Sequence, residues 1–128
     1  MRRFITSACT AAALLFVAAP AQAQDMPAPP EGETATVTAT VVDLACKFTH
    51  NLSGDEHRMC AQVCADKGVP LVLLGSDGTV YLPAGEGMPS DGQNERLKEF
   101  AEQKVEVSGE VFEAGGARVI RIDDVKRA

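Results

Sequence analysis

Polar and apolar residues alternate with a period of two along residues 34–42. In a strand, successive side chains point to opposite faces, so this period gathers the apolar ones on one side. The apolar face comprises Ala35, Val37, Ala39 and Val41. The pattern therefore predicts a half-buried strand that runs to about residue 44 and leaves Cys46 just past its end.

A helix is predicted next, because start and stop signals frame residues 54–67. Ser53 and Glu56 have the spacing of a capping box, in which the two residues bond each other's backbone N–H groups. Gly68 suits the left-handed position that ends a helix, and Pro70 cannot continue one. These signals place the helix at residues 54–67.

The rest of the chain alternates between short strand patterns and turns. Two apolar runs flank a four-residue turn, and two longer runs flank Gly115 and Gly116, so each pair predicts a hairpin. Leu97, Phe100 and Ala101 recur at helical spacing. The predicted elements are strands at 70–74, 79–82, 105–112 and 118–125, a loop at 83–93 and a short helix at 94–103.

This order of elements predicts a mainly β domain with two helices, of the α+β class. A five-stranded barrel of the OB type carries a helix between its third and fourth strands, where residues 94–103 lie. The cysteine-bearing helix is then an insertion after the first strand, in a connection that OB folds use for binding. We predict a single OB-like domain over residues 34–126. An open antiparallel sheet fits the same order and is the alternative.

The N-terminal residues 1–23 have the pattern of a cleavable secretory signal. Arg2 and Arg3 precede an apolar run, and A-Q-A at 21–23 has the small-x-small form of a cleavage site. Cleavage there predicts export to the periplasm, about 105 mature residues and no membrane insertion. Cys9 would be lost with the signal. Residues 24–33 are rich in proline and acid, which predicts a flexible lead-in.

The charge of the chain argues against several classes of partner. The formal net charge is −6, and losing the two arginines of the signal would leave −8. An acidic chain lacks the basic surface that neutralises nucleic-acid phosphates or anionic lipids. Trp is absent and Tyr81 is the only tyrosine, so a stacking platform for bases is not expected. The predicted partners are a metal ion or a periplasmic protein, and we expect a monomer.

Three cysteines and a histidine form the chemically specialised cluster of the predicted mature chain. On a helical wheel of about 100° per residue, His57, Cys60 and Cys64 lie within about 60° of one another. Cys46 follows the first strand and can fold back over this face. Soft sulfur ligands select Cu(I) or Zn(II), and an odd number of thiols favours a metal site.

The spacing of the ligands favours copper over zinc. Zinc needs four ligands, which would be the three cysteines with His57 or His50. Cu(I) is satisfied by two or three sulfurs, and C-x13-C-x3-C lacks the paired short knuckles of zinc fingers. We therefore predict a Cu(I) site with Cys60 and Cys64 as core ligands, Cys46 as the third and His57 as an auxiliary ligand, with zinc as the second choice.

Two other uses of the cysteines remain open. Cys46 could form a disulfide with Cys60 or Cys64 and leave one buried thiol, as in a non-catalytic binding or adaptor domain. A thiol–disulfide redox protein is the other alternative, although C-x3-C differs from the C-x-x-C of such proteins. Met59 lies off the helix face that His57, Cys60 and Cys64 share, so we expect it to pack and not to bind a metal. His50 lies in a predicted loop, so we expect it to be solvated. No enzyme activity is predicted.

Three stretches of the chain carry a resemblance: V-D-L-A-C at 42–46, H-x-x-C-A-x-x-C-A-x-x-G-x-P-L at 57–71 and D-G-x-V-Y-L at 77–82. They resemble a group of small exported bacterial proteins, over about residues 34–125, and this resemblance implies no activity. The segment 104–125 is similar to the last strands of bacterial OB-like periplasmic domains, among them the CusF-like Cu(I)-binding proteins. Those proteins bind copper through His, Met and Trp on barrel strands, so the resemblance supports the fold more than the metal. The combined prediction is a periplasmic Cu(I) carrier or buffer.

Overall fold

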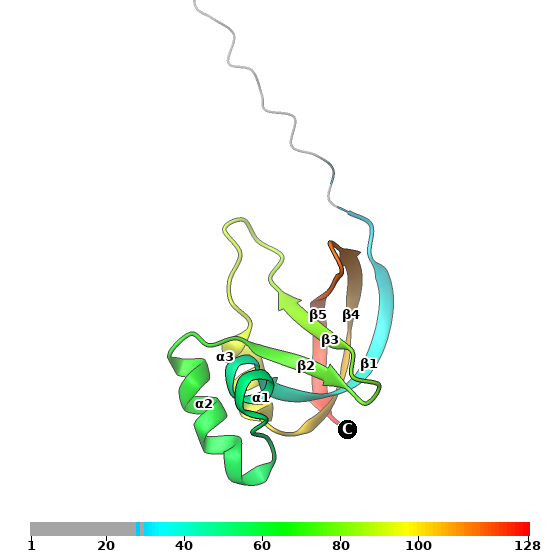
Figure 1. Cartoon of the computed structure of the whole chain (residues 1–128). Coiled ribbons are helices and arrows are strands. Elements are labelled where there is room, and N and C mark those ends of the chain that lie inside the picture. Colours follow the sequence, from blue (N-terminus) through cyan, green and yellow to red (C-terminus); the bar gives the residue numbers. More distant parts are fainter. Residues whose placement is uncertain (1–27, 29) are drawn as a thin grey trace, which may run out of the picture.

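The structure, a computed structural model, describes residue 28 and residues 30–128. The predicted signal at 1–23 and half of the predicted lead-in (residues 24–27 and 29) lie outside the described residues. The described chain forms five strands and several short helical segments (Figure 1). The strands are β1 (Glu33–Asp43), β2 (Leu71–Gly75), β3 (Val80–Ala84), β4 (Lys104–Ala114) and β5 (Ala117–Arg127). The helical segments are α1 (Leu44–His50), η1 (Asp55–His57), α2 (Arg58–Asp66), α3 (Asn94–Leu97) and η2 (Lys98–Phe100).

The strands close into a barrel in the order β1-β2-β3-β5-β4. The long strand β1 pairs with β4 along its first part and with β2 along its last part, both antiparallel. The barrel closes where β3 pairs with β5 in parallel, with Tyr81 opposite Arg118. This confirms the predicted five-stranded OB-like barrel, with the cysteine-bearing helix inserted between β1 and β2, and it excludes the open sheet.

A glycine allows two of the strands to approach closely. The register of β4 and β5 shifts between Ser108 and Gly109. A Cβ atom at Gly109 would lie 2.0 Å from the backbone oxygen of Arg121, a distance that no side chain tolerates. Irregularities of this kind bend a strand and help a small sheet to curl.

The core fills the barrel interior and extends under α3 and η2. Strand alternation points one side of each strand inward, as predicted for β1, where Ala39 and Val41 are buried and Val37 packs against the core. Leu97, Phe100 and Ala101 are also buried. The fully buried side chains from the strands include Leu73, Val105, Val107 and Ile120. Leu97 and Phe100 therefore belong to the same core as the strands.

The structure corrects the sequence prediction where β1 ends. The strand stops at Asp43, and Cys46 lies inside the helix α1, which the sequence analysis did not predict. Asp43 has extended backbone angles, and its side-chain oxygen accepts a hydrogen bond from the Cys46 backbone N–H at 2.7 Å. Aspartate in this position is a strong helix N-cap, so α1 begins directly from the strand.

The second helix starts differently from the prediction and ends as predicted. The residue before its first turn is Gly54, which makes no side-chain cap, so the capping box of Ser53 and Glu56 is wrong. The hydroxyl of Ser53 instead accepts from the side chain of Lys47. At the other end, Gly68 has a φ of 91°, and the N–H groups of residues 68 and 69 bond the last carbonyls of the helix, as a Schellman ending requires.

The predicted helix at 94–103 is shorter in the structure. It comprises α3 and η2 and ends at Phe100, because Glu102 has a positive φ of 61° that breaks the helical path. Within the described part of the chain, no helix is long and apolar enough to cross a membrane.

Candidate metal centre

The insertion between β1 and β2 gathers the predicted ligands beside the barrel. Figure 1 shows α1 and α2 side by side, and α2 also contacts α3. Cys46 lies on α1, whereas Cys60 and Cys64 lie one turn apart on α2. Successive turns of a helix put such residues on one face. Two neighbouring helices therefore present their sulfur atoms to each other.

Two groups of side chains in this region have the geometry to hold a metal ion. The first contains Cys46, His57 and Cys60, and the second contains Asp43, Cys46 and Cys64. Within each group, one ligand atom from every residue lies within 4.8 Å of the others. Cys46 belongs to both groups, whereas Cys60 and Cys64, the predicted core pair, fall in different groups. The four predicted ligands are thus divided between two groups that share Cys46.

His57 is oriented by a buried carboxylate. Its Nδ1 atom lies 2.9 Å from Oε1 of Glu102, and the two side chains are 9% and 1% exposed. A carboxylate accepts hydrogen bonds, so we assign the imidazole proton to Nδ1. The Nε2 atom is buried and has no hydrogen-bond partner. An imidazole held by a carboxylate on one nitrogen and free on the other has the arrangement of a metal ligand.

Glu102 links the insertion to the barrel. Its second carboxylate oxygen accepts from the Gly54 backbone N–H at 2.8 Å. Its own backbone N–H donates to the Val41 carbonyl of β1, also at 2.8 Å. The sequence analysis missed Glu102, because its partner His57 is 45 residues away along the chain. No local pattern signals such a contact.

Asp43 is the other residue of the site that the sequence analysis did not propose as a ligand. Its side chain is fully buried. One oxygen caps α1, while Oδ2 is buried and lacks a partner of ordinary hydrogen-bond geometry. Buried polar atoms without partners are rare and costly. The D-x-x-C spacing at the end of a strand is a local signal that could have identified this residue, but the sequence analysis did not use it.

The surroundings of Cys64 and Cys46 keep both thiols protonated. The nearby Asp43 carboxylate, to which the Cys64 thiol is a weak donor at imperfect geometry, raises the pKa of Cys64 to about 12, and burial adds to this effect. Partial burial and the Asp43 charge raise the pKa of Cys46. A metal ion binds the thiolate form, so it would have to displace these protons.

The other side chains considered as ligands lie apart from the centre. Met59 is 77% exposed, and His50 is exposed at the end of α1. The three cysteines of the described chain are free thiols, with Cys60 exposed and the other two half-buried. Exposure of Cys60 gives the site a route to solvent.

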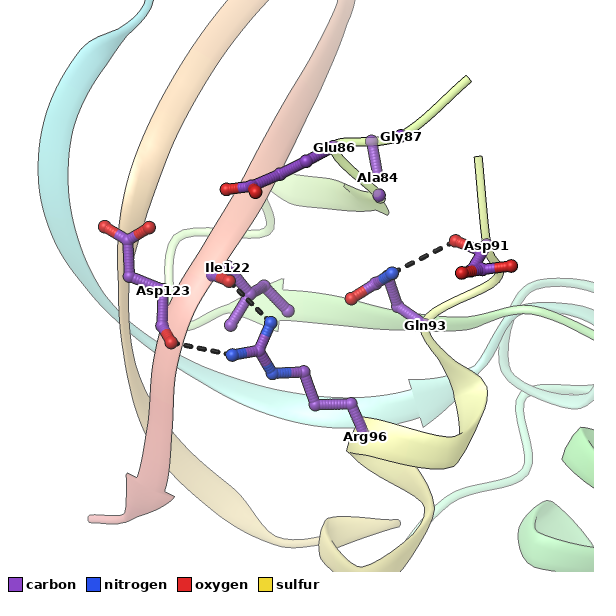
Figure 2. Close-up of a pocket in the computed structure, with 9 residues that line it drawn as sticks. Ala84, Glu86, Gly87, Asp91, Gln93, Arg96, Ile122 and Asp123 are labelled. Atoms are coloured by element: carbon purple, nitrogen blue, oxygen red, sulfur yellow. Dashed lines mark hydrogen bonds between the residues drawn. The ribbon is translucent and has the colours of Figure 1, made fainter. Parts of the chain in front are cut away.

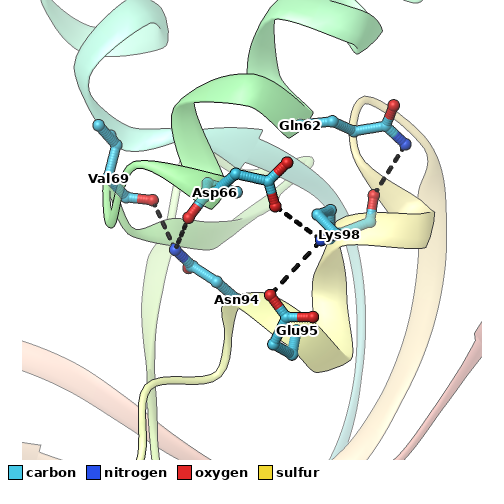
Figure 3. A network of polar contacts seen from close by, with 7 residues as sticks. Gln62, Asp66, Val69, Asn94, Glu95 and Lys98 are labelled. Atoms are coloured by element: carbon cyan, nitrogen blue, oxygen red, sulfur yellow. Dashed lines mark hydrogen bonds and ion pairs between the residues drawn. The ribbon is translucent and has the colours of Figure 1, made fainter.

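Polar contacts fasten α2 to the segment formed by α3 and η2 (Figure 3). The side-chain amide of Asn94 donates to the backbone oxygens of Ala65 and Val69, at 3.0 and 2.8 Å. Lys98 pairs with Asp66 at 2.6 Å, and Gln62 donates to the Lys98 carbonyl at 3.2 Å. These contacts fix the last turn of α2, which carries Cys64, against the barrel.

A separate hollow of about 480 Å³ lies beside the loop between β3 and α3. Figure 2 shows that Arg96 reaches from α3 to the backbone oxygens of Ile122 and Asp123, at 2.6 and 2.7 Å. Its guanidinium is thus committed to the barrel wall. The contacts of Arg96 hold α3 against β5. No cysteine of the described chain lines this hollow.

No family model matches this chain, and no curated protein or solved structure matches it either. The resemblance to small exported bacterial proteins therefore remains a prediction. The site itself rests on its geometry: cysteine and histidine groupings that could bind a metal ion.

Proposed function

We propose that this protein is an exported metal-binding protein that carries or buffers a soft metal ion, with Cu(I) as its first cargo and Zn(II) as the second. The observation that carries the proposal is the group formed by Cys46, His57 and Cys60, whose ligand atoms all lie within 4.8 Å. His57 belongs to this group, and its Nε2 atom is buried without a hydrogen-bond partner. Cys64 supplies a further sulfur next to Cys46.

The composition of this group favours copper over zinc. Two thiolates and one imidazole complete a three-coordinate site for Cu(I), whereas Zn(II) would lack its fourth ligand. Structural zinc sites also have four protein ligands, whereas this group supplies three, and its Cys60 is exposed. An exposed sulfur allows another protein or a small thiol to deliver and remove the ion, as a carrier requires.

The proposed location follows from the predicted signal at residues 1–23. An exported carrier in the periplasm would receive its ion from, and pass it to, other periplasmic proteins. The OB-like barrel supports this function as a scaffold, because the connection after its first strand is a common binding position in that fold.

Competition with a Cu(I) chelator under reducing conditions tests the proposal. The mature wild-type protein should bind Cu(I) much more tightly than micromolar. The double variant Cys60→Ser/Cys64→Ser should lose this affinity. Met59→Leu is the matched control, because it removes an exposed sulfur outside the two groups. Wild-type binding at micromolar strength or weaker would reject the proposal.

A binding or adaptor domain with a structural disulfide is the second candidate. The sulfur of Cys46 lies within 4.8 Å of those of Cys60 and Cys64, so a small movement would allow a bond to either. Mass spectrometry of protein isolated from its own compartment, alkylated without reduction, distinguishes the two candidates. One modified thiol would favour the disulfide, and three modified thiols after metal removal would exclude it.

A further inference from the structure

The second group of ligand atoms contains a carboxylate as well as two sulfurs. Asp43, Cys46 and Cys64 each offer one atom within 4.8 Å of the others. Asp43 is fully buried, and its Oδ2 atom has no partner of ordinary hydrogen-bond geometry. A buried carboxylate oxygen left without a full partner costs free energy, and a bound cation would offset that cost.

The carboxylate is already fixed in direction. Its other oxygen accepts the Cys46 backbone N–H at 2.7 Å as the cap of α1. This bond limits rotation of the carboxylate, whose other oxygen, Oδ2, is buried without such a partner. The same bond ties the position of Asp43 to the first turn of α1, on which Cys46 lies. Two of the three ligand atoms are thus positioned by one short segment at the end of β1.

We propose that Asp43, Cys46 and Cys64 form a second metal position, which takes a divalent ion of the zinc class and shares the Cys46 thiolate with the first position. This inference rests on the proposed function for the first position, at Cys46, His57 and Cys60. A thiolate sulfur has lone pairs for two ions, so one cysteine can bridge them. Cys46 is the residue that the two groups have in common.

The donor set identifies the class of ion. Thiolates suit both Cu(I) and Zn(II), whereas carboxylate oxygen is a common ligand of Zn(II) and suits harder ions than Cu(I). Charge points the same way. With both positions filled, three thiolates and the Asp43 carboxylate would carry four negative charges. One Cu(I) and one Zn(II) would bring three positive charges, whereas two Cu(I) ions would bring only two and leave more of the ligand charge unbalanced, which is costly away from water.

Zinc titration of protein that already holds one equivalent of Cu(I) tests the second position. The wild type should bind one further Zn(II) in competition with a zinc chelator. Asp43→Asn should weaken this zinc binding by more than about 100-fold, since loss of a ligand should exceed the roughly 10–100-fold effect of losing a residue that only hydrogen-bonds a ligand. Asparagine is also a good N-cap, so the variant keeps α1 but loses the anionic oxygen. Asp55→Asn, an exposed acid in the same insertion, is the control and should bind zinc like the wild type.

The outcomes separate this inference from the proposed function. Equal zinc binding by the wild type and Asp43→Asn would overturn the inference and leave Asp43 as a helix cap only. Should Asp43→Asn fail to fold, Cys64→Ser leaves the cap intact, and unchanged zinc binding there would overturn the inference equally. Cu(I) binding at the first position is measured separately, and Asp43→Asn should retain it. A wild type that does not hold Cu(I) would reject the proposed function, whereas zinc binding that depends on Asp43 in metal-free protein would still support the second position.

Discussion

The barrel and the insertion between β1 and β2 (residues 44–70) are built on different principles. The barrel encloses a continuous apolar core from all five strands, with Leu97 and Phe100 closing it. In the insertion, α1 has no buried residue, and α2 buries only Ala61 and Ala65. Burial of small side chains contributes little free energy. The barrel therefore provides the stability, and the insertion depends on the barrel for its position.

Directional polar contacts hold the insertion instead of an apolar core of its own. Glu102 holds His57 and Gly54, and Arg58 donates to the Glu99 carbonyl at 2.8 Å. Asn94 holds the end of α2. Such contacts define orientation more than they add stability. The ligands are therefore oriented by polar contacts to the barrel, whereas the stability comes from the core of the barrel itself.

A cavity in the barrel should produce the largest effect. Leu73 is fully buried in β2, and Leu73→Ala should lower the free energy of unfolding by about 2–5 kcal/mol. Val63→Ala, on the exposed side of α2, should change it by less than about 0.5 kcal/mol. Denaturant unfolding of metal-free protein measures both. Equal losses would show that the insertion belongs to the stabilising core after all.

Removal of the shared thiol should disable the metal centre without unfolding the barrel. Cys46→Ser should weaken Cu(I) binding by more than about 100-fold, because it removes a ligand and not merely a residue that hydrogen-bonds one. Cys64→Ser should have a smaller effect on the first equivalent of Cu(I), because Cys64 belongs to the second group. Chelator competition compares the two variants. A larger loss in Cys64→Ser would contradict the central position of Cys46.

The contact between barrel and insertion should tune affinity more than stability. Glu102→Gln preserves the shape of the side chain but removes the charge that orients the His57 imidazole. The expected result is a loss of roughly 10–100-fold in Cu(I) affinity. Glu99→Gln changes an exposed neighbour and is the matched control. If both variants bind like the wild type, Glu102 has no part in preparing His57.

The smallest effect is expected in the turn between β2 and β3, which contains Asp77 and Thr79. The Thr79 backbone N–H and then its hydroxyl bond Asp77, and they hold the pKa of Asp77 below its usual 3.8. Because the pKa of Asp77 is lower in the folded protein, its ionised carboxylate stabilises the fold above about pH 3.8. This stabilisation is lost as the pH falls through the pKa that Asp77 has in the folded protein. An NMR titration of the Asp77 carboxyl should show the low pKa, and Thr79→Ala should move it back toward 3.8. An unshifted carboxyl would show that these bonds do not persist in solution.

The barrel could be predicted from the sequence because its signals are local. Alternation in residues 34–42 and the turns at Gly78 and Gly115 specify strands and hairpins, and all five strands are present in the structure. The stripe of His57, Cys60 and Cys64 was also visible, because helical spacing is local.

The rest of the site depends on contacts made only in the folded chain. Asp43 ends a strand that looks longer from its apolar pattern, so α1 was missed. The sequence pattern places Glu102 in a helix at 94–103. In the structure its left-handed backbone turns the side chain toward His57. The choice of Cys46 as the shared ligand follows from how α1 and α2 pack, which no spacing along the chain encodes.

X-ray absorption at the copper edge, on wild-type protein loaded with one equivalent of Cu(I), tests whether Cys46, His57 and Cys60 form the copper centre. We expect the nearest neighbours of the copper to be mostly sulfur, together with imidazole scattering that disappears in His57→Gln and a sulfur signal that falls in Cys60→Ser. A shell of nitrogen and oxygen alone, or a spectrum that neither substitution changes, would contradict a copper centre at Cys46, His57 and Cys60.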